Sequence, residues 1–413
     1  MNIKKESTGG GLRELVGTRA FYKKVLLVAV PIMIQNGITN FVSLLDNIMV
    51  GQVGTEQMSG VAIANQLVFI FNLCIFGAVA GAGILGAQFY GSGNSEGVRD
   101  TFRFKLLFGV ILSAIFAVIF LTVGEPLIQQ FIHQGEGIGD LEATRSYGKA
   151  YLEVIVIGIL PFALTQCYSG TLRETGETVI PMIAGIIAVL VNLVFNYILI
   201  FGKLGAPELG CVGAAIATVL SRFVELAIVA GWTHKHVARN PFIRGALRSF
   251  KIPGSLLKQI IAIGLPLFIN ELMWSFGITF MTQCYSVRGL EVVAAFNIAN
   301  TISNVFNVVF LSLGNSVGII IGQMLGAGRL EEAKREDKQL IAFSVFCCFL
   351  TGAMLILLSP FFPRMYNTEE TVKELATQLI FITGCCQPAA IRLRAWHVFY
   401  PARRRKIRCH FFV

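Results

Sequence analysis

Apolar segments long enough to cross a lipid bilayer recur along this chain, separated by short polar breaks. A helix needs roughly 20 mostly apolar residues to span about 30 Å of hydrocarbon. Only 14% of the residues are charged, against about 25% in ordinary soluble domains. The pattern predicts an all-α polytopic membrane protein. Ten membrane-spanning helices are predicted, over residues 25–46, 58–88, 104–124, 148–168, 179–201, 211–232, 257–284, 292–325, 339–359 and 372–388.

The basic residues concentrate in alternate polar breaks, as the positive-inside rule predicts for a protein of the plasma membrane. This distribution explains the net charge of +10 without a nucleic-acid partner. The segment 1–24 lacks the features of a cleavable signal peptide, so we expect it to remain as a cytoplasmic N-terminal segment. The basic breaks contain Lys4, Lys5, Arg13, Arg19, Lys23, Lys24, Arg99, Arg103, Lys105, Arg173, Lys235, Arg239, Arg244, Arg248, Lys251, Lys258, Arg329, Lys334, Arg335 and Lys338.

An internal repeat relates the two halves of the chain. Sliding the sequence against itself by 235 residues, without gaps, matches residues through a helix, a loop and the next helix. Such a match exceeds what shared hydrophobicity gives, so it indicates a duplication. The matched pairs include Pro31 and Pro266, Gly54 and Gly289, Glu56 and Glu291, Asn65 and Asn300, Asn72 and Asn307, Gly83 and Gly318, and Gln88 and Gln323.

The duplication predicts two pseudo-symmetric six-helix bundles with a central cleft, of which the second is incomplete. Both copies begin on the same side of the membrane, as expected for parallel repeats. The N-lobe covers 25–232 and contains helices 1 to 6, and 233–256 is a cytoplasmic linker between the lobes. The partial C-lobe covers 257–388 and contains helices 7 to 10.

Two acids break the symmetry of the repeat and are the first functional candidates. Asp46 in the first helix aligns with Met281, and Glu271 in the seventh aligns with Asn36. A charge at the centre of a membrane helix costs about 2.5–3.5 kcal/mol on insertion scales, and such residues usually mark an ion or proton path. We therefore expect both acids to contribute to coupling.

Three polar residues of the fifth and sixth helices could join Asp46 in a cation site. Asn192 and Asn196 lie one helical turn apart on one face, and Thr218 lies in the next helix. Their oxygens, with the Asp46 carboxylate, suit a hard cation such as Na⁺. Protonation of Asp46 alone would equally serve a proton-coupled carrier. For the asparagines and Thr218, plain helix packing is an equally good explanation.

The symmetric amide pairs Asn65/Asn300 and Asn72/Asn307 are explained first by hydrogen bonds between helices. A substrate cleft is also expected, with Asn36, Asn65, Gln66, Asn270 and Asn300 as its residues. Two further acids are expected to be structural. Glu225, three residues after Arg222, should form a helix ion pair, and Glu153 should reach water near a helix end.

Motifs for direct energy coupling or catalysis are absent from the sequence. It contains no G-x-x-x-x-G-K-[ST] phosphate loop, no His/Cys metal cluster and no nucleophile elbow. We therefore predict a transporter without cofactors, driven by an Na⁺ or H⁺ gradient, rather than an enzyme. A receptor or scaffold without transport would explain neither a symmetric cleft nor asymmetric acids.

Three segments together resemble the multidrug and toxic compound extrusion (MATE) family of secondary transporters: PIMIQNGITNFVSLLDNIMVG at 31–51, SGTLRETGETVIP at 169–181 and NLVFNYILIFG at 192–202. The resemblance extends over the chain up to Pro388. It implies twelve helices in two lobes, and export of cationic or amphiphilic compounds in exchange for Na⁺ or H⁺. It also implies that Asp46 is the family's helix-1 aspartate and Glu271 the helix-7 glutamate. A monomer in contact with membrane lipids is expected.

The sequence departs from the family pattern at Asn196, where many members with an N-lobe cation site have an aspartate. One formal charge, that of Asp46, then remains in the cluster, which leaves the coupling ion open. The alternative function is that of a flippase for a lipid-linked precursor with the same two-lobe plan. Flippase clefts are expected to be more basic, so the buried acids argue against it.

The tail 389–413 is basic, aperiodic and unlike its expected counterpart at 171–178. Back-translation from Tyr400 with permissible codons gives TAC CCT GCG CGC CGG CGG AAA ATC CGT. Read one base later, the same bases encode Thr-Leu-Arg-Ala-Gly-Gly-Lys-Ser, which resembles the first repeat. We therefore expect a frame slip between Pro388 and His397 that leaves helices 11 and 12 untranslated.

Overall fold

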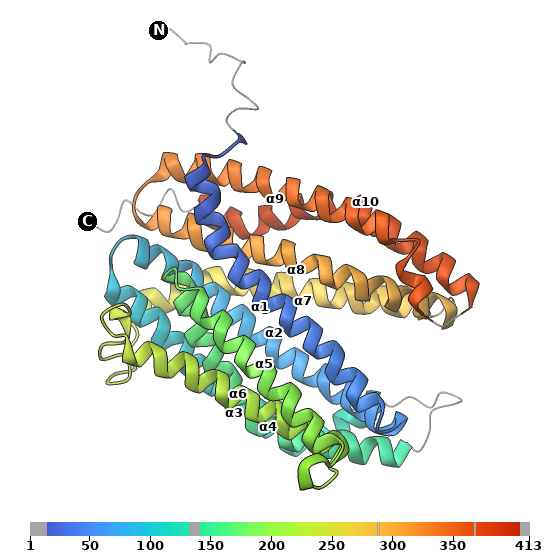
Figure 1. Cartoon of the computed structure of the whole chain (residues 1–413). Coiled ribbons are helices and arrows are strands. Elements are labelled where there is room, and N and C mark those ends of the chain that lie inside the picture. The colour runs from blue at the N-terminus through green and yellow to red at the C-terminus, as the bar shows by residue number, and fades with distance from the viewer. Residues whose placement is uncertain (1–14, 132–140, 287, 289, 367–368, 405–413) are drawn as a thin grey trace, which may run out of the picture. The chain divides into compact units, whose positions relative to one another are not determined.

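The computed structural model describes residues 15–131, 141–286, 288, 290–366 and 369–404, and these ranges contain helices and no strand (Figure 1). Three short 3-10 helices are η2 (Lys203–Gly205), η3 (Pro241–Ile243) and η4 (Phe362–Met365). The long helices are α1 (Arg19–Gly51), α2 (Thr55–Gly91), α3 (Ser95–Phe131), α4 (Leu141–Glu174), α5 (Val179–Ile200), α6 (Gly210–Lys235), α7 (Gly254–Ser286), α8 (Leu290–Gly326), α9 (Leu330–Leu358) and α10 (Glu370–Arg404).

Each predicted span coincides with one of these helices to within one residue at the ends of α5 and α9, which confirms the all-α membrane fold. Among the described helices, α1 to α9 are long and apolar enough to cross a membrane, and α10, which contains the predicted span 372–388, is not one of these nine. Most helices run beyond the apolar segment, because polar residues continue the helix outside hydrocarbon. α9, for example, begins at Leu330 rather than at 339, and its first turns contain a Lys334–Glu331 ion pair.

The backbone of α10 continues to Arg404, 16 residues past the predicted end at 388. Arg, Leu and Ala are good helix formers, which accounts for a helical backbone in this segment. The side chains from 388 onward, all of 405–413, and residues 1–14 of the predicted N-terminal segment lie outside the described residues.

The chain divides into two compact units whose boundaries fall inside α1 and α7. The C-unit comprises 1–33, 91–93 and 273–413, and the N-unit comprises 34–90 and 94–272. The predicted lobes, in contrast, assign each of these two helices to a single half. In the N-unit, α6 packs on both α4 and α5, and α3 packs on α4; in the C-unit, α8, α9 and α10 pack on one another.

The first half of α1 completes the core of the C-unit. Its apolar side chains Phe21, Val25 and Ala29 are buried together with residues of α8 and α9. The α8 contributors include Val317 and Ile320. A helix of the first repeat thus packs against helices of the second.

The N-unit contains the corresponding arrangement. The buried residues Leu256 and Ile260, at the start of α7, form a core cluster with Ala82 and Leu85 of α2. Under the 235-residue register these four residues correspond to Phe21, Val25, Val317 and Ile320 of the C-unit. The two repeats therefore form equivalent packing contacts. In the C-unit these contacts are made by the start of α1, from the first repeat, and in the N-unit by the start of α7, from the second.

Gly81 and Gly264 permit the contact between α2 and α7. A Cβ on Gly81 would lie 2.5 Å from the Gly264 Cα atom, closer than real Cβ contacts. Absence of side chains at both positions lets the two backbones approach each other, as small residues do in membrane proteins.

The segment after α6 folds onto α3 instead of forming a free basic loop. Phe242, Ile243 and Ala246 are buried in a cluster with α3 and α4. Arg103 of α3 donates hydrogen bonds to the carbonyl oxygens of Ala246 at 3.0 Å and Gly245 at 2.7 Å. These bonds fix the segment after α6 against α3.

Candidate cation and substrate site

Asp46 and Asn196 join α1 to α5 inside the N-unit. The Asn196 amide nitrogen donates a hydrogen bond of 2.5 Å to Asp46 Oδ1. Asn196 is fully buried and Asp46 is half-buried. Among the described residues, no Lys, Arg or His nitrogen lies within the 4.0 Å of an ion pair with this carboxylate. Asp46 is therefore held by an amide and not by a cationic side chain.

A chain of hydrogen bonds extends from this pair to α6. The Asn196 amide also donates to Asn192 Oδ1 at 3.1 Å, and the Asn192 amide donates to Thr218 Oγ1 at 3.3 Å. The one-turn spacing on α5 places both asparagines on the buried face. The structure thus brings together the four residues that the sequence suggested as ligands.

One oxygen in this cluster has no hydrogen-bond donor. Asn196 Oδ1 is buried and has no partner within the described part of the chain. A buried acceptor without a donor costs free energy, and a cation beside it would remove that cost. Together with the Asp46 carboxylate, this oxygen belongs to the ligand class that hard cations prefer. The arrangement can also hold a proton on Asp46.

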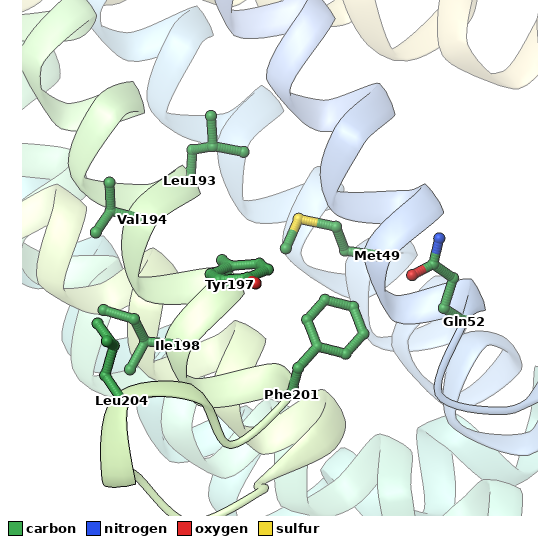
Figure 2. A pocket seen from close by; sticks show the side chains of 8 residues that line it. All are labelled: Met49, Gln52, Leu193, Val194, Tyr197, Ile198, Phe201 and Leu204. Carbon is green, nitrogen blue, oxygen red and sulfur yellow. The ribbon is translucent and has the colours of Figure 1, made fainter.

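A groove of about 540 Å³ lies between the ends of α1 and α5, and residues close to Asp46 and Asn196 in the sequence line it. Met49 follows Asp46 by one turn, and Tyr197 follows Asn196 directly. Figure 2 shows Met49, Tyr197 and Phe201 converging in the groove. Its polar groups are the Gln52 amide and the Tyr197 hydroxyl. The lining residues are Met49, Gln52, Leu193, Val194, Tyr197, Ile198, Phe201 and Leu204.

The predicted cleft amides belong to different units. Asn36, Asn65, Gln66 and Asn270 are in the N-unit, where Asn65 and Gln66 are exposed and the other two half-buried. Asn300 is half-buried in the C-unit. Their role in a cleft stays a prediction.

Two amides of the repeat form the expected bonds between helices. Asn65 Oδ1 accepts a hydrogen bond of 3.2 Å from the Tyr151 hydroxyl of α4. Asn307 Oδ1 accepts one of 3.1 Å from the Gln387 amide of α10. Tyr151 was missed as a candidate because an aromatic residue in an apolar segment gives no signal of its own.

The other predicted acids have different outcomes. The side chain of Glu271 lies outside the described residues, so only its place in α7 is reported. Glu153 is exposed, as expected. The predicted Arg222–Glu225 ion pair is wrong: no pair within 4.0 Å joins them, and Arg222 instead lies over the ring of Phe162. The guanidinium gains a cation–π contact there.

The prediction that Lys105 lies in a polar break is also wrong. Lys105 is fully buried inside α3, and its ammonium donates to both oxygens of Glu174 at 2.6 Å and to Thr171 Oγ1 at 3.1 Å. In the other repeat, Leu340 aligns with Lys105. This difference in charge between the repeats was the sequence signal that could have identified Lys105 as a special residue. Arg173, placed in another break, lies in α4 and donates to Gln35 Oε1 at 2.6 Å.

Comparison with known proteins identifies similar transport proteins. The family model MatE matches residues 31–198 and 266–396. The chain is 27% identical to a probable multidrug resistance protein NorM of Thermotoga maritima, over 88% of this chain and 76% of the relative. It is 26% identical to the multidrug resistance protein MdtK of Edwardsiella ictaluri, over 88% of this chain and 78% of that protein.

Solved structures have the same fold. A crystal structure of MATE in complex with MaD3S matches with a TM-score of 0.81 at 22% identity, over 96% of this chain and 85% of that one. An outward-facing multidrug resistance MATE family transporter of the MOP superfamily matches with a TM-score of 0.80 at 21% identity, over 96% and 87% of the two chains.

Proposed function

The chain belongs to the MatE family of membrane transporters, and from this premise we propose that it is a secondary antiporter. It exports cationic or amphiphilic compounds in exchange for Na⁺ or H⁺, by alternating access of its two lobes. The relatives' description as multidrug resistance proteins supports this substrate class.

The observation that carries the proposal is the hydrogen bond from the Asn196 amide nitrogen to Asp46, which leaves the buried Asn196 Oδ1 without a donor. A half-buried carboxylate beside a buried oxygen without a donor is an unfavourable arrangement that a bound cation or proton improves. Asn192 and Thr218 hold the Asn196 amide in place through the hydrogen-bond chain. Asp46 is therefore the principal coupling residue, and Glu271 contributes from α7.

The groove between α1 and α5 supports the substrate class. Its apolar lining accommodates a hydrocarbon or aromatic body, and the Asp46 carboxylate lies one helical turn from Met49. An amphiphilic cation can thus place its apolar part in the groove and its charge toward Asp46. The amides of the predicted cleft would serve the same ligand during transport.

The alternating distribution of basic residues supports a plasma-membrane location with the N-terminus in the cytoplasm. We propose a monomer in contact with lipids, because the apolar side chains exposed on α3 suit hydrocarbon.

Dye efflux from proteoliposomes tests this function. A cationic dye is loaded, and its export is followed under an Na⁺ gradient and, separately, under a proton gradient. We expect one of the two gradients to drive export by the wild type and not by Asp46→Asn. The variant should still insert into the membrane and unfold at a similar temperature. Export by Asp46→Asn at the wild-type rate refutes the coupling role. Absence of dye export under both gradients, with movement of a lipid-linked precursor instead, would favour the flippase.

A further inference from the structure

The segment 236–253, which joins α6 to α7, exposes side chains that the proposed transport cycle does not use. The candidate membrane span of α6 ends at Lys235, and that of α7 begins at Gly254. Because the segment itself, which the structure describes throughout, contains no further span, both of its ends lie at the same surface of the membrane.

Packing against α3 holds this segment at the level of the helix ends. The ring of Phe242 lies 5.4 Å from that of Phe102, centre to centre, in an edge-to-face contact. Phe102 is in the second turn of α3, close to the start of another candidate span at Ser95. The segment is therefore folded against the ends of the spans, at the depth of the lipid headgroups, instead of extending into water.

The basic side chains of the segment have no acidic partner. In the described part of the chain, no carboxylate oxygen lies within 4.0 Å of the basic nitrogens of four exposed residues: Arg239, Arg244, Arg248 and Lys251. The acids at the start of α3, Glu96 and Asp100, pair with Arg99 and Arg103 of the same helix. The sequence has no Asp or Glu from 226 to 270. The segment thus retains its positive charge.

Two large apolar side chains are exposed between these basic residues. Leu247 is 53% exposed and Phe250 is 48% exposed, although the segment lies outside the apolar spans. Burial of such side chains at the boundary between headgroups and acyl chains removes apolar surface from water. Basic residues beside exposed apolar ones are typical of segments that lie in the membrane interface.

We propose that Arg244, Arg248 and Lys251 bind the phosphate groups of acidic phospholipids, while Leu247 and Phe250 enter the boundary between headgroups and acyl chains. Basic residues next to a membrane are attracted to anionic lipids. The occupant is a lipid, and not a nucleic acid or a soluble protein, because the segment lies at the membrane surface and exposes apolar side chains beside its charges. The inference does not depend on Asp46 being the coupling site.

Native mass spectrometry of the purified full-length chain tests the binding. The protein in detergent is titrated with phosphatidylglycerol and, separately, with phosphatidylcholine of the same acyl chains. Each basic residue near a membrane contributes about fivefold in affinity. The Kd for phosphatidylglycerol should therefore rise on the order of thirtyfold in Arg244→Gln/Arg248→Gln. It should stay near the wild-type value in Arg244→Lys/Arg248→Lys, which keeps both charges.

A matched control removes two positive charges from another helix end. Arg329→Gln/Lys334→Gln acts at the start of α9, where the two residues pair with Glu332 and Glu331. This variant should bind phosphatidylglycerol nearly as tightly as the wild type. Equal weakening in the two double variants would assign the effect to net charge and overturn the inference. An unchanged Kd in Arg244→Gln/Arg248→Gln would overturn it as well.

Hydrogen–deuterium exchange locates the contact and tests its apolar part. In nanodiscs, amide exchange in 239–251 should be slower with phosphatidylglycerol than with phosphatidylcholine alone. Leu247→Ser/Phe250→Ser should remove most of this difference, while its unfolding temperature in phosphatidylcholine stays near that of the wild type. Equal exchange of the wild type in both lipids would contradict the proposal. Reversal of the slowing by excess inorganic phosphate would assign the site to a free anion instead.

Discussion

Asp46 on α1 and Asn196 on α5 are joined by a hydrogen bond in which the amide donates to the carboxylate at 2.5 Å. The bond uses the nitrogen of Asn196 and leaves its buried oxygen without a donor. An amide at this position therefore donates to the acid and leaves an oxygen free to accept, without adding charge. Replacement of Asn196 by an acid removes the donated hydrogen bond and adds a negative charge, so it tests which of the two properties matters for cation binding.

Asn196→Asp should strengthen Na⁺ binding on the order of tenfold, because a second carboxylate adds negative charge beside Asp46. The measurement is the Na⁺ concentration that half-protects Asp46 from carbodiimide, at a pH high enough to ionise both acids. Asn196→Ser is the uncharged control and should bind Na⁺ no better than the wild type. Equal affinities of the Asp and Ser variants would contradict the prediction.

Met49→Trp should hinder amphiphile transport, because the larger ring occupies part of the groove shown in Figure 2. We expect the KM for a cationic dye to rise at least severalfold, while Na⁺ protection of Asp46 stays the same. The matched control is Val118→Trp on α3, where the side chain is 61% exposed. An unchanged KM in Met49→Trp would exclude the groove from the substrate path.

Lys105→Met should destabilise the N-unit by about 3–5 kcal/mol, because the buried Glu174 carboxylate would lose its 2.6 Å ion pair with Lys105. Glu174→Gln should have a similar effect. The double variant should recover most of the loss, since neither charge remains. Unfolding temperatures of the four proteins in one detergent test this cycle. Additive losses in the double variant would show that the 2.6 Å contact is not the source of the effect.

Gly81→Ala should lower stability, because its Cβ would lie 2.5 Å from the Gly264 backbone and force α2 and α7 apart. We expect a loss of about 1–3 kcal/mol, the usual cost of overpacking. Gly277→Ala on α7 is the matched control, since a Cβ there meets no atom within 4 Å. Similar unfolding temperatures for both variants would show that the close approach is not required.

Nucleotide sequencing tests the frame slip predicted in the tail. The codons from Tyr400 onward should encode Thr-Leu-Arg-Ala-Gly-Gly-Lys-Ser when read one base later. Codons that give another series in that frame, followed by no MATE-like sequence in any frame, would contradict the prediction.

The helices and the grouping of Asp46, Asn192, Asn196 and Thr218 could be predicted because each follows from a pattern in the sequence. Lipid forces the backbone into helices, so apolar length is enough to locate them. Asp46 differed in charge from its repeat counterpart, and the one-turn spacing of Asn192 and Asn196 fixed a shared face. The alignment could not reveal the orphaned Asn196 oxygen, because that depends on the orientation of one amide.

The packing of the start of α1 in the C-unit and of the start of α7 in the N-unit could not be predicted from the sequence. The two repeats share their apolar pattern, so the face containing Phe21 and Val25 fits the second helix of either copy. Lys105 was misplaced because membrane topology rules count basic residues near helix ends and do not register burial. Its partner Glu174 is 69 residues away in the chain, a separation that local patterns do not reach.

The exchange of α1 and α7 has a consequence for the origin of this protein. A polypeptide with one copy of the repeat would leave the α2 face around Ala82 and Leu85 uncovered, unless another molecule supplied its first helix. The ancestor before gene duplication would then have been an obligate dimer with swapped arms. Fusion of two such genes would make that association intramolecular, and each half could then acquire its own acid, Asp46 in one and Glu271 in the other.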